Sequence, residues 1–350
     1  MPQTLKAEAL TRFGLQVLQA HGVPEEDAQL LADSLVVAEL WGHSSHGMLR
    51  LPWYVERLRS GAMVTVTAPS LAVDQGAVVV IDGHEGIGQV LARKAVHIGM
   101  ERALKFGVSA VGVRNSNHFG TVAYFTREAA EAGFVTFMCT NASPSMPPWG
   151  GKAKALGNNP WSLAAPAGKY GVAVMDIANT AVARGKIYLA AERGQDIPAG
   201  WATDANGLPT TKAQDAIHGL IQPMAGHKGY IISFMMDVLA GVLTGSQFGT
   251  GVAGPYQAEK RSGCGHMLLT INVAAMMRRD EFESRMEALV SEMKAVPRVE
   301  GVDEIFFPGE IEARNAEKHG RLGVELADQT WQSLSRLASE TGVALPEVGA

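Results

Sequence analysis

The chain has 350 residues, of which 47% are hydrophobic and 19% charged, and its formal net charge is −5. These proportions supply apolar side chains for one large domain or two smaller ones and argue against disorder as the general state. The acidic balance, with no basic block, argues against nucleic acid as the main partner.

The N-terminal region has apolar residues at helical spacing over 4–21 and 25–42. Pro24, followed by three acidic residues, makes a good start for the second helix. Proline fits the first helical turn, and acidic side chains are favoured at the positive end of the helix dipole. A third helix is predicted over about 52–60, ending at Gly61. We therefore expect the first 70 residues to be all-helical.

Beyond residue 70 the pattern changes to alternating strands and helices. Strands are predicted over 78–82, 108–113, 134–140, 161–165, 171–176 and 266–273. Helices are predicted over 88–105, 119–132, 180–191, 229–243, 280–294 and 321–342. The turn-rich stretches 194–212 and 244–264 are expected to be loops. Such alternation predicts a mixed α/β fold with a central sheet.

A helical unit that clasps a central sheet domain explains this order of elements. We predict a helical domain over 1–72, joined by helices from about 213–262 and 312–350. The sheet-containing domain is predicted over 73–212 and 263–311.

Cysteine usage and hydropathy bear on where the protein works. Cys139 and Cys264 are far apart, and neither belongs to a C-x-x-C pair. A disulfide framework or a cysteine zinc site is therefore not expected, and a reducing compartment fits. The start of the chain reads as an amphipathic helix rather than a signal peptide. The apolar stretch 230–243 is interrupted by Asp237 and is too short to span a bilayer. We expect a soluble cytoplasmic protein without a membrane partner.

The stretch Ser45-His46-Gly47, with Arg50 four residues after His46, is the first candidate site. On a helix, His46, Arg50 and Tyr54 would share one face, although Pro52 makes that alignment approximate. Imidazole exchanges protons near neutral pH, and guanidinium grips a carboxylate with two parallel hydrogen bonds. His46 would then exchange a proton with a substrate oxygen, assisted by Ser45, while Arg50 and Tyr54 bind the substrate. The alternative is an interhelix turn with a capping serine and a surface arginine.

A metal site is a further possibility at this stretch, since His43 and His46 lie three residues apart. Neither an H-E-x-x-H pattern nor a nearby acidic cluster accompanies them. We therefore assign no metal ligands.

The second candidate site is the stretch 115–120, Asn-Ser-Asn-His-Phe-Gly. His118 follows a predicted strand and opens a predicted helix, where backbone N–H groups attract phosphate or carboxylate. Gly120 permits close approach of a ligand to the backbone. The alternative is a helix-entry turn with a structural histidine.

The glycines of 82–88 follow a strand and suggest a dinucleotide-binding loop of Rossmann type. However, Leu91 stands where that motif needs its third glycine, and the next strand ends in Arg114 rather than an acid. We therefore interpret 82–88 as a structural turn.

Other turns lie near these sites in the proposed fold. They are 147–151, 157–160 and 307–310, each of which could line a ligand site or be a plain turn. Lys228, just before a predicted buried helix, could reach a phosphate or a substrate oxygen, or could be solvated.

Taken in order along the chain, these stretches resemble the malate/L-lactate dehydrogenase family that lacks the Rossmann fold. The motifs that carry the resemblance are Ser45-His46-Gly47 with Arg50, 115–120, Pro148-Trp149-Gly150-Gly151, Asn159-Pro160, Ala183-Arg184-Gly185-Lys186, Lys228-Gly229 and Pro308-Gly309-Glu310. The family includes sulfolactate and ureidoglycolate dehydrogenases, diketogulonate reductase and cyclic-imine carboxylate reductases. The resemblance implies a homodimer with a non-Rossmann, mixed-sheet cofactor domain and a helical domain.

By resemblance, the activity is nicotinamide-dependent oxidoreduction of 2-hydroxy or 2-oxo acids. His46 or His118 would be the proton donor and acceptor, with Ser45 assisting His46, and Arg50 would hold the substrate carboxylate. The cofactor would be NAD or NADP, with NAD preferred. The cofactor contacts implied are His118, Phe119, Gly120, Thr121, Val122, Asp176, Ile177, Ala178, Lys228, Pro308, Gly309 and Glu310.

Two departures from the family pattern keep alternatives open. Asp176 is followed by Ile-Ala-Asn where the family often has Ala-Thr-Ser, and Lys186 stands where some imine reductases have an aspartate. We predict a malate-, lactate- or sulfolactate-like dehydrogenase. The alternatives are a reductase of a cyclic imine carboxylate or a diketo sugar acid using NADPH, a metal-dependent lyase or hydrolase, and a non-catalytic binding protein.

Overall fold

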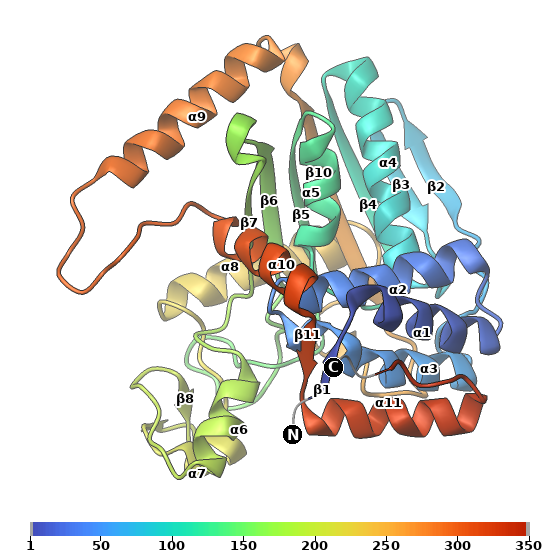
Figure 1. Ribbon diagram of the computed structural model, residues 1–350, viewed down its shortest axis with the longest axis vertical. Helices are drawn as coiled ribbons and strands as arrows, with labels where there is room; N and C mark the ends of the chain where they lie inside the picture. Colours follow the sequence, from blue (N-terminus) through green and yellow to red (C-terminus); the bar gives the residue numbers. More distant parts are fainter. Residues whose placement is uncertain (1–2, 348–350) are drawn as a thin grey trace.

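The computed structural model describes residues 3–347 and has a mixed seven-stranded sheet at its centre (Figure 1). In spatial order its strands are β2 Ser70–Gln75, β3 Val78–Asp82, β4 Val108–Ser116, β10 Cys264–Asn272, β5 Phe134–Thr140, β6 Trp161–Pro166 and β7 Val172–Ile177. β3 and β4 run parallel, while the other neighbouring pairs run antiparallel. The predicted α/β class with a mixed sheet is confirmed, and this topology differs from the parallel sheet of a Rossmann fold.

Two helices cover one face of this sheet, α4 Gly88–Phe106 and α5 Ala123–Glu131 (Figure 1). The core between them and the strands includes Val79, Ile81, Leu91, Val96, Val111, Val113, Phe125, Met138 and Leu268. Continuous apolar runs in β3 and β4 therefore become the sheet side of this core, as expected for strands that helices cover. Gly107, at φ +80°, ends α4 in a left-handed turn directly before β4.

The opposite face carries α8 His227–Asp237 and the π-turn η4 Val238–Val242 at one end of the strands. Beside them the strand registers align six apolar side chains, one from each of six strands. This apolar row consists of Val78, Ala110, Leu269, Phe137, Leu163 and Met175. Val78, Leu163 and Leu269 are 46%, 41% and 37% exposed, so much of this face lies open to solvent.

A separate helical core packs against the sheet unit. It is formed by α1 Ala7–Ala20, α2 Glu25–Leu40, α3 Leu51–Ser60 and α11 Asp328–Thr341. Here the all-helical expectation is wrong at one place, because β1 Gln3–Leu5 pairs with β11 Val324–Leu326. A strand this short depends on a partner more than 300 residues away, so local periodicity does not reveal it.

The remaining elements lie outside these two cores. They are α6 Arg184–Glu192, α7 Ala213–His218, α9 Arg279–Ala295, α10 Glu310–Leu322, the short hairpin β8 Ala202–Thr203 with β9 Pro209–Thr210, and the 3-10 turns η5 Gly249–Gly251 and η6 Val273–Ala275. The expected loop 194–212 thus contains a short hairpin whose two strands have two residues each. The edge strand β2 was not predicted, because it is exposed along its length. Helix α10 falls within the helices expected from about residue 312, whereas the helix predicted over 321–342 is interrupted by β11 and continues as α11. Within residues 3–347, none of the helices combines the length and apolarity needed to cross a membrane. The predicted domain boundaries stay a prediction.

Candidate active site

The segment that joins α2 to α3 carries the first candidate site. It forms two 3-10 turns, η1 Ser44–His46 and η2 Met48–Arg50, rather than one continuous helix. Gly47 separates them and packs against Glu39, since a Cβ at Gly47 would lie 2.2 Å from Glu39 Oε1. The same Glu39 oxygen accepts the Met48 N–H at 2.8 Å. A buried carboxylate therefore fixes this turn, and only glycine fits beside it.

This arrangement brings together the five residues that we call the histidine site: Ser45, His46, Arg50, Tyr54 and His118. The His46 and His118 rings stack with centroids 5.8 Å apart and an interplanar angle of 20°. His46 Nδ1 lies 3.0 Å from Ser45 Oγ, and His118 Nδ1 lies 2.7 Å from the Tyr54 hydroxyl. Among residues 3–347 neither Nε2 atom has a hydrogen-bond partner, so each ring keeps one nitrogen for a ligand.

Burial and positive charge keep both imidazoles neutral at pH 7. Desolvation, helped by Arg50 and His43, lowers the pKa of His46 to about 4. Desolvation, with Arg50 and His46, also holds the pKa of His118 well below its usual range. An anion bound to Arg50 would offset the Arg50 contribution, so ligand binding should raise both pKa values.

Arg50 has the geometry of a free carboxylate clamp. Its guanidinium lies 4.2 Å from the centroid of the Trp53 ring, and its Nε donates to Ser45 O at 2.6 Å. Within the described part of the chain no carboxylate pairs with Arg50. The stacked ring and the Nε bond fix the plane of the fork, and its two terminal nitrogens are available for a ligand.

Buried polar contacts behind the histidine site hold it in place. Arg57, 1% exposed, donates to Asn117 Oδ1 at 2.8 Å and to Gln257 O at 2.9 Å. His266 packs edge-on against Phe119 at 4.6 Å and is hydrogen-bonded to Ser116 Oγ at 2.7 Å. Arg57 and His266 were not among the residues predicted for the site. Their partners lie 60 and 150 residues away, so nothing in the local pattern points to them.

Two neighbouring cavities, which we call the cleft, lie beside the histidine site. The smaller one, about 130 Å³, is lined by His43, His46, Gly120, Thr121, Val122, Asn158, Pro160, Asp176 and Ala178. The larger one, about 390 Å³, is lined by Trp41, His43, Ala123, Arg127, Val174, Met175, Asp176, Ile177, Phe306, Phe307, Pro308, Gly309, Ile311 and Glu312. They share His43 and Asp176, so the two cavities adjoin.

Most of the implied cofactor contacts lie along this cleft. Those that line it are Gly120, Thr121, Val122, Asp176, Ile177, Ala178, Pro308 and Gly309. Phe119 is buried against His266, and Glu310 is buried behind the turn 306–309. Lys228 is exposed at the start of α8 and lines neither cavity. All twelve assignments remain predictions.

The cleft has the properties of a dinucleotide site. Its larger part is mainly apolar with a few charged groups, as expected for a pocket that takes a ring system. The Thr121 hydroxyl is buried without a hydrogen-bond partner in the structure, so a ligand atom or water has to satisfy it. A Cβ at Gly120 would meet no atom within 4 Å, which leaves room beside the backbone. These observations fit the nicotinamide cofactor that the motifs imply.

Asp176 is the one carboxylate that lines both cavities. It accepts the Ala123 N–H at 2.8 Å, at the start of α5. Burial nevertheless raises the pKa of Asp176 to about 6. The charged form of Asp176 is therefore less favoured than in water, and a hydrogen-bond donor from a ligand would stabilise it.

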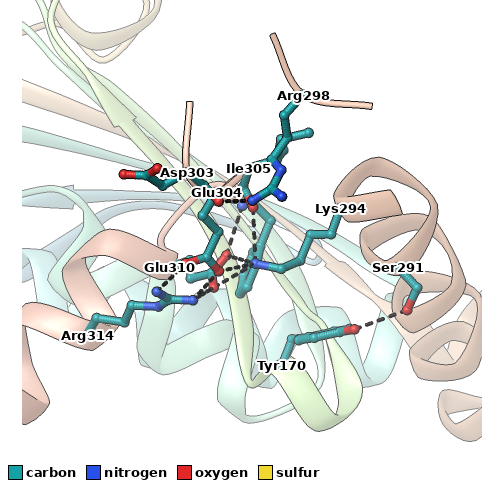
Figure 2. A network of polar contacts seen from close by, with 10 residues as sticks. Tyr170, Ser291, Lys294, Arg298, Asp303, Glu304, Ile305, Glu310 and Arg314 are labelled. Atoms are coloured by element: carbon teal, nitrogen blue, oxygen red, sulfur yellow. Dashed lines mark hydrogen bonds and ion pairs between the residues drawn. The ribbon is translucent and has the colours of Figure 1, made fainter. Parts of the chain in front are cut away.

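The turn 306–309 forms one wall of the larger cavity and is docked on β7. Pro308 O accepts the Val174 N–H at 3.0 Å. Gly309 has φ +92°, and a Cβ there would lie 2.5 Å from Val174 Cγ1. Figure 2 shows that charged side chains, among them Lys294 and Glu310, lie behind this turn.

Metal ligation has no donor set to support it. Across residues 3–347 no group of three or more His, Cys, Asp and Glu side chains is arranged to hold an ion. His43 Nε2 instead lies 3.5 Å from Glu312 Oε1. The metal-dependent alternative therefore gains no support from the geometry.

Comparison with known proteins gives a consistent result. The sequence profile of the family described as "Malate/L-lactate dehydrogenase" matches residues 5–335. The malate/(S)-sulfolactate dehydrogenase of Methanothermus fervidus is 36% identical over 331 residues, covering 95% of this chain and 96% of that protein. The structure of sulfolactate dehydrogenase from Methanocaldococcus jannaschii superposes with a TM-score of 0.94 at 36% identity, covering 99% and 98% of the two chains. That of Δ1-piperideine-2-carboxylate reductase from Pseudomonas syringae pv. tomato gives 0.84 at 28% identity, covering 96% and 100%.

Proposed function

The chain belongs to the malate/L-lactate dehydrogenase family, and from that premise we propose that it transfers a hydride between a nicotinamide cofactor and C2 of a small 2-hydroxy or 2-oxo acid. One observation carries the proposal: two stacked imidazoles, each with a free Nε2, lie beside a guanidinium that has no acidic partner within residues 3–347. This arrangement suits a substrate with a carboxylate next to an oxygen that gains or loses a proton.

In the proposed mechanism each protein residue has one task. Arg50 holds the carboxylate, and Trp53 and Ser45 keep its guanidinium in plane. When bound, the nicotinamide cofactor supplies or accepts the hydride. In oxidation one imidazole Nε2 accepts the proton of the 2-hydroxyl, and in reduction it donates a proton to the same oxygen. A hydrogen bond to that oxygen also stabilises the negative charge that develops on it.

Tyr54 acts through His118 in this scheme. The Gly120 N–H points at His118 Nδ1 at 3.3 Å, and the Tyr54 hydroxyl lies 2.7 Å from the same atom. With two such groups at Nδ1, the neutral ring carries its proton on Nε2. In the ligand-free protein the Nε2–H of His118 is therefore available to donate a hydrogen bond to a substrate oxygen, and His46 with Ser45 is the first candidate to accept a proton.

For the cofactor we propose NAD rather than NADP. The carboxylates of Asp176 and Glu312 line the larger cavity, where Arg127 is the one guanidinium among the lining residues. A carboxylate can accept hydrogen bonds from ribose hydroxyls and repels a 2′-phosphate. The residues that would hold the cofactor are those along the cleft, from Gly120 to Val122, Asp176 to Ala178 and the turn at Pro308.

A second candidate function is reduction of a cyclic imine carboxylate. It rests on the similarity to the piperideine-carboxylate reductase structure, which extends over 96% of this chain. The same clamp and imidazoles would serve, because such a substrate also has a carboxylate next to the carbon that receives the hydride.

One assay tests both candidates. Purified protein is given malate, lactate, sulfolactate and ureidoglycolate with NAD or NADP, and the matching 2-oxo acids and cyclic imine carboxylates with NADH or NADPH. We expect turnover of at least one 2-hydroxy acid with NAD. Turnover confined to imines with NADPH would favour the second candidate, and dinucleotide binding without any turnover would reject both.

We further propose that two copies associate through the open sheet face. The apolar row lies next to α8 and η4, whose Phe234 and Val242 are 50% and 55% exposed. An exposed apolar strip beside exposed apolar side chains can pair with the same surface of a second copy about a two-fold axis. Sedimentation should show a dimer. Leu163→Lys should shift the dimer to monomer, while Leu189→Lys, a control on α6 at a similarly exposed position (43% against 41%), should not. A monomeric parent protein would reject this interface.

We also propose a cytoplasmic location. Cys139 and Cys264 are buried free thiols, which suits a reducing compartment. Fractionation of cells that express the protein tests this point.

A further inference from the structure

Four charged residues behind the turn 306–309 form a network that we call the ionic clasp: Lys294, Glu304, Glu310 and Arg314 (Figure 2). Lys294 Nζ lies 2.8 and 2.7 Å from the two carboxylate oxygens of Glu310 and 3.1 Å from Glu304 Oε1. Arg314 Nη1 lies 2.7 Å from Glu304 Oε2. One ammonium and one guanidinium thus share two carboxylates.

The clasp joins both ends of the segment 296–309. Lys294 belongs to the last turn of α9, where the helix dipole favours a cation. Glu310 opens α10, where the dipole favours an anion, and its Oε2 accepts the Phe307 N–H at 3.2 Å. Lys294 Nζ also donates to Ile305 O at 3.1 Å. The clasp therefore contacts the backbone on both sides of Phe306.

Helix α9 is in turn attached to the sheet. At η3 Gly168–Tyr170, between β6 and β7, the Lys169 N–H donates to Glu287 Oε1 at 2.8 Å. The Tyr170 hydroxyl lies 3.0 Å from Ser291 Oγ (Figure 2). The turn 306–309 thus has two attachments to the sheet unit. One is its direct contact with Val174, and the other runs through the clasp and α9.

We propose that Lys294 is a positioning residue for the cofactor: through the clasp it fixes the turn 306–309 as a wall of the cleft and so sets the affinity for the dinucleotide. This inference rests on the proposed function. Lys294 lines neither cavity, and the histidine site is held by separate contacts, so the clasp acts on binding and not on the chemical step.

Exposed ion pairs usually contribute little, because solvent screens them and long side chains lose freedom. Here Glu310 is only 11% exposed, and one ammonium serves two carboxylates and a carbonyl. Without Lys294 the two carboxylates retain Arg314 alone, and the Ile305 carbonyl loses the ammonium. The turn should then sample positions that narrow or open the larger cavity.

The test compares Lys294→Met with Lys169→Met in the full-length enzyme. Lys169 is 60% exposed and its Nζ lies 3.7 Å from Glu287, so the control removes the same charge in the same region without touching the clasp. We expect the Kd for NADH, from quenching of tryptophan fluorescence, to rise roughly three- to tenfold for Lys294→Met and less than twofold for the control. At saturating cofactor kcat should stay within twofold. Added salt should weaken NADH binding more steeply in the parent than in Lys294→Met.

Equal NADH affinity of the two lysine variants overturns the inference, as does a loss confined to kcat. If Lys294→Met does not fold, by circular dichroism, Glu304→Gln in otherwise intact protein replaces it, with a smaller expected rise in Kd and the same criterion. If the unmodified protein binds neither NADH nor NADPH, the proposed function fails, and this inference fails with it.

Discussion

The histidine site and the turn 306–309 are held by opposite means. The histidine site is enclosed by buried neutral contacts, such as Tyr54 on His118, and by Arg57, which reaches three separate parts of the chain. The turn is held to β7 by the hydrogen bond between Val174 N–H and Pro308 O, and it is held from behind by charged side chains near the surface. Proton transfer needs atoms fixed to a fraction of an ångström, whereas a cofactor has to enter and leave. The difference suggests that chemistry and cofactor exchange are controlled separately.

The largest expected effect is the loss of kcat when the imidazole of His46 or His118 is removed. His46→Asn and His118→Asn should each lower kcat by about 10²–10⁴-fold, the usual contribution of general acid–base catalysis. The Kd for NADH should change far less than kcat, because the turn 306–309 and most residues that line the cleft are untouched, although His46 itself lines the smaller cavity. Steady-state kinetics and an NADH titration measure the two effects. If both variants keep near-normal turnover, the proton-transfer assignment is wrong.

The substrate clamp should give the next largest effect. Arg50→Met should raise the KM for the acid roughly 10- to 100-fold, since it removes charged hydrogen bonds to the carboxylate. Arg50→Lys keeps the charge but not the fork and should recover only part of the affinity. Initial rates against acid concentration decide the matter, and an unchanged KM for Arg50→Met would count against the clamp.

For the turn 306–309, two matched glycine substitutions separate the effect of the left-handed backbone from the effect of the contact with Val174. Gly309→Ala adds a Cβ 2.5 Å from Val174 Cγ1, whereas Gly301→Ala, at a similar φ of +82°, meets no atom within 4 Å. Both should cost about 1 kcal/mol of stability for the left-handed backbone. Only Gly309→Ala should also weaken NADH binding, by roughly three- to tenfold. Equal NADH affinity in the two variants would show that docking on Val174 does not shape the cavity.

The last prediction concerns stability against pH, where His46 and Asp176 should respond with opposite signs. The pKa of His46 is lowered from 6.5 to about 4, so His46 costs stability as pH falls from 6.5 towards 4. The pKa of Asp176 is raised from 3.8 to about 6, so its charge costs stability at neutral pH, and this cost is relieved as pH falls from 6 towards 4. Relative to the parent, His46→Asn should gain stability on acidification by about 1–3 kcal/mol. Asp176→Asn should lose stability by a smaller amount, because the Asp176 side chain is exposed in β7 and solvent screens its charge. Urea unfolding at pH 4.5, 5.5 and 7 measures both slopes, and parallel slopes would refute the assignment.

The sheet and its covering helices could be predicted because their pattern is local. Apolar runs mark β3 and β4, and helical spacing marks α4. The candidate residues His46 and His118 could be found because their polar, glycine-containing surroundings do not suit a core. The geometry of the site could not be found in this way. The single helix that would align His46, Arg50 and Tyr54 is broken at Gly47 by contact with Glu39, and Tyr54 meets His118 across 64 residues. The clasp was missed because Lys294 and its partners look like ordinary surface charges until the fold brings them together.

The pairing of β1 with β11 has a consequence for the order in which the molecule is made. The helical core that carries α3 is completed by Leu326, Leu334 and Leu337, near the end of the chain. During synthesis the sheet strands up to residue 272 emerge before these residues, so the sheet unit can form first. Helices α1 to α3 can therefore complete their core only after residue 337 has been translated, and the histidine site assembles after that point.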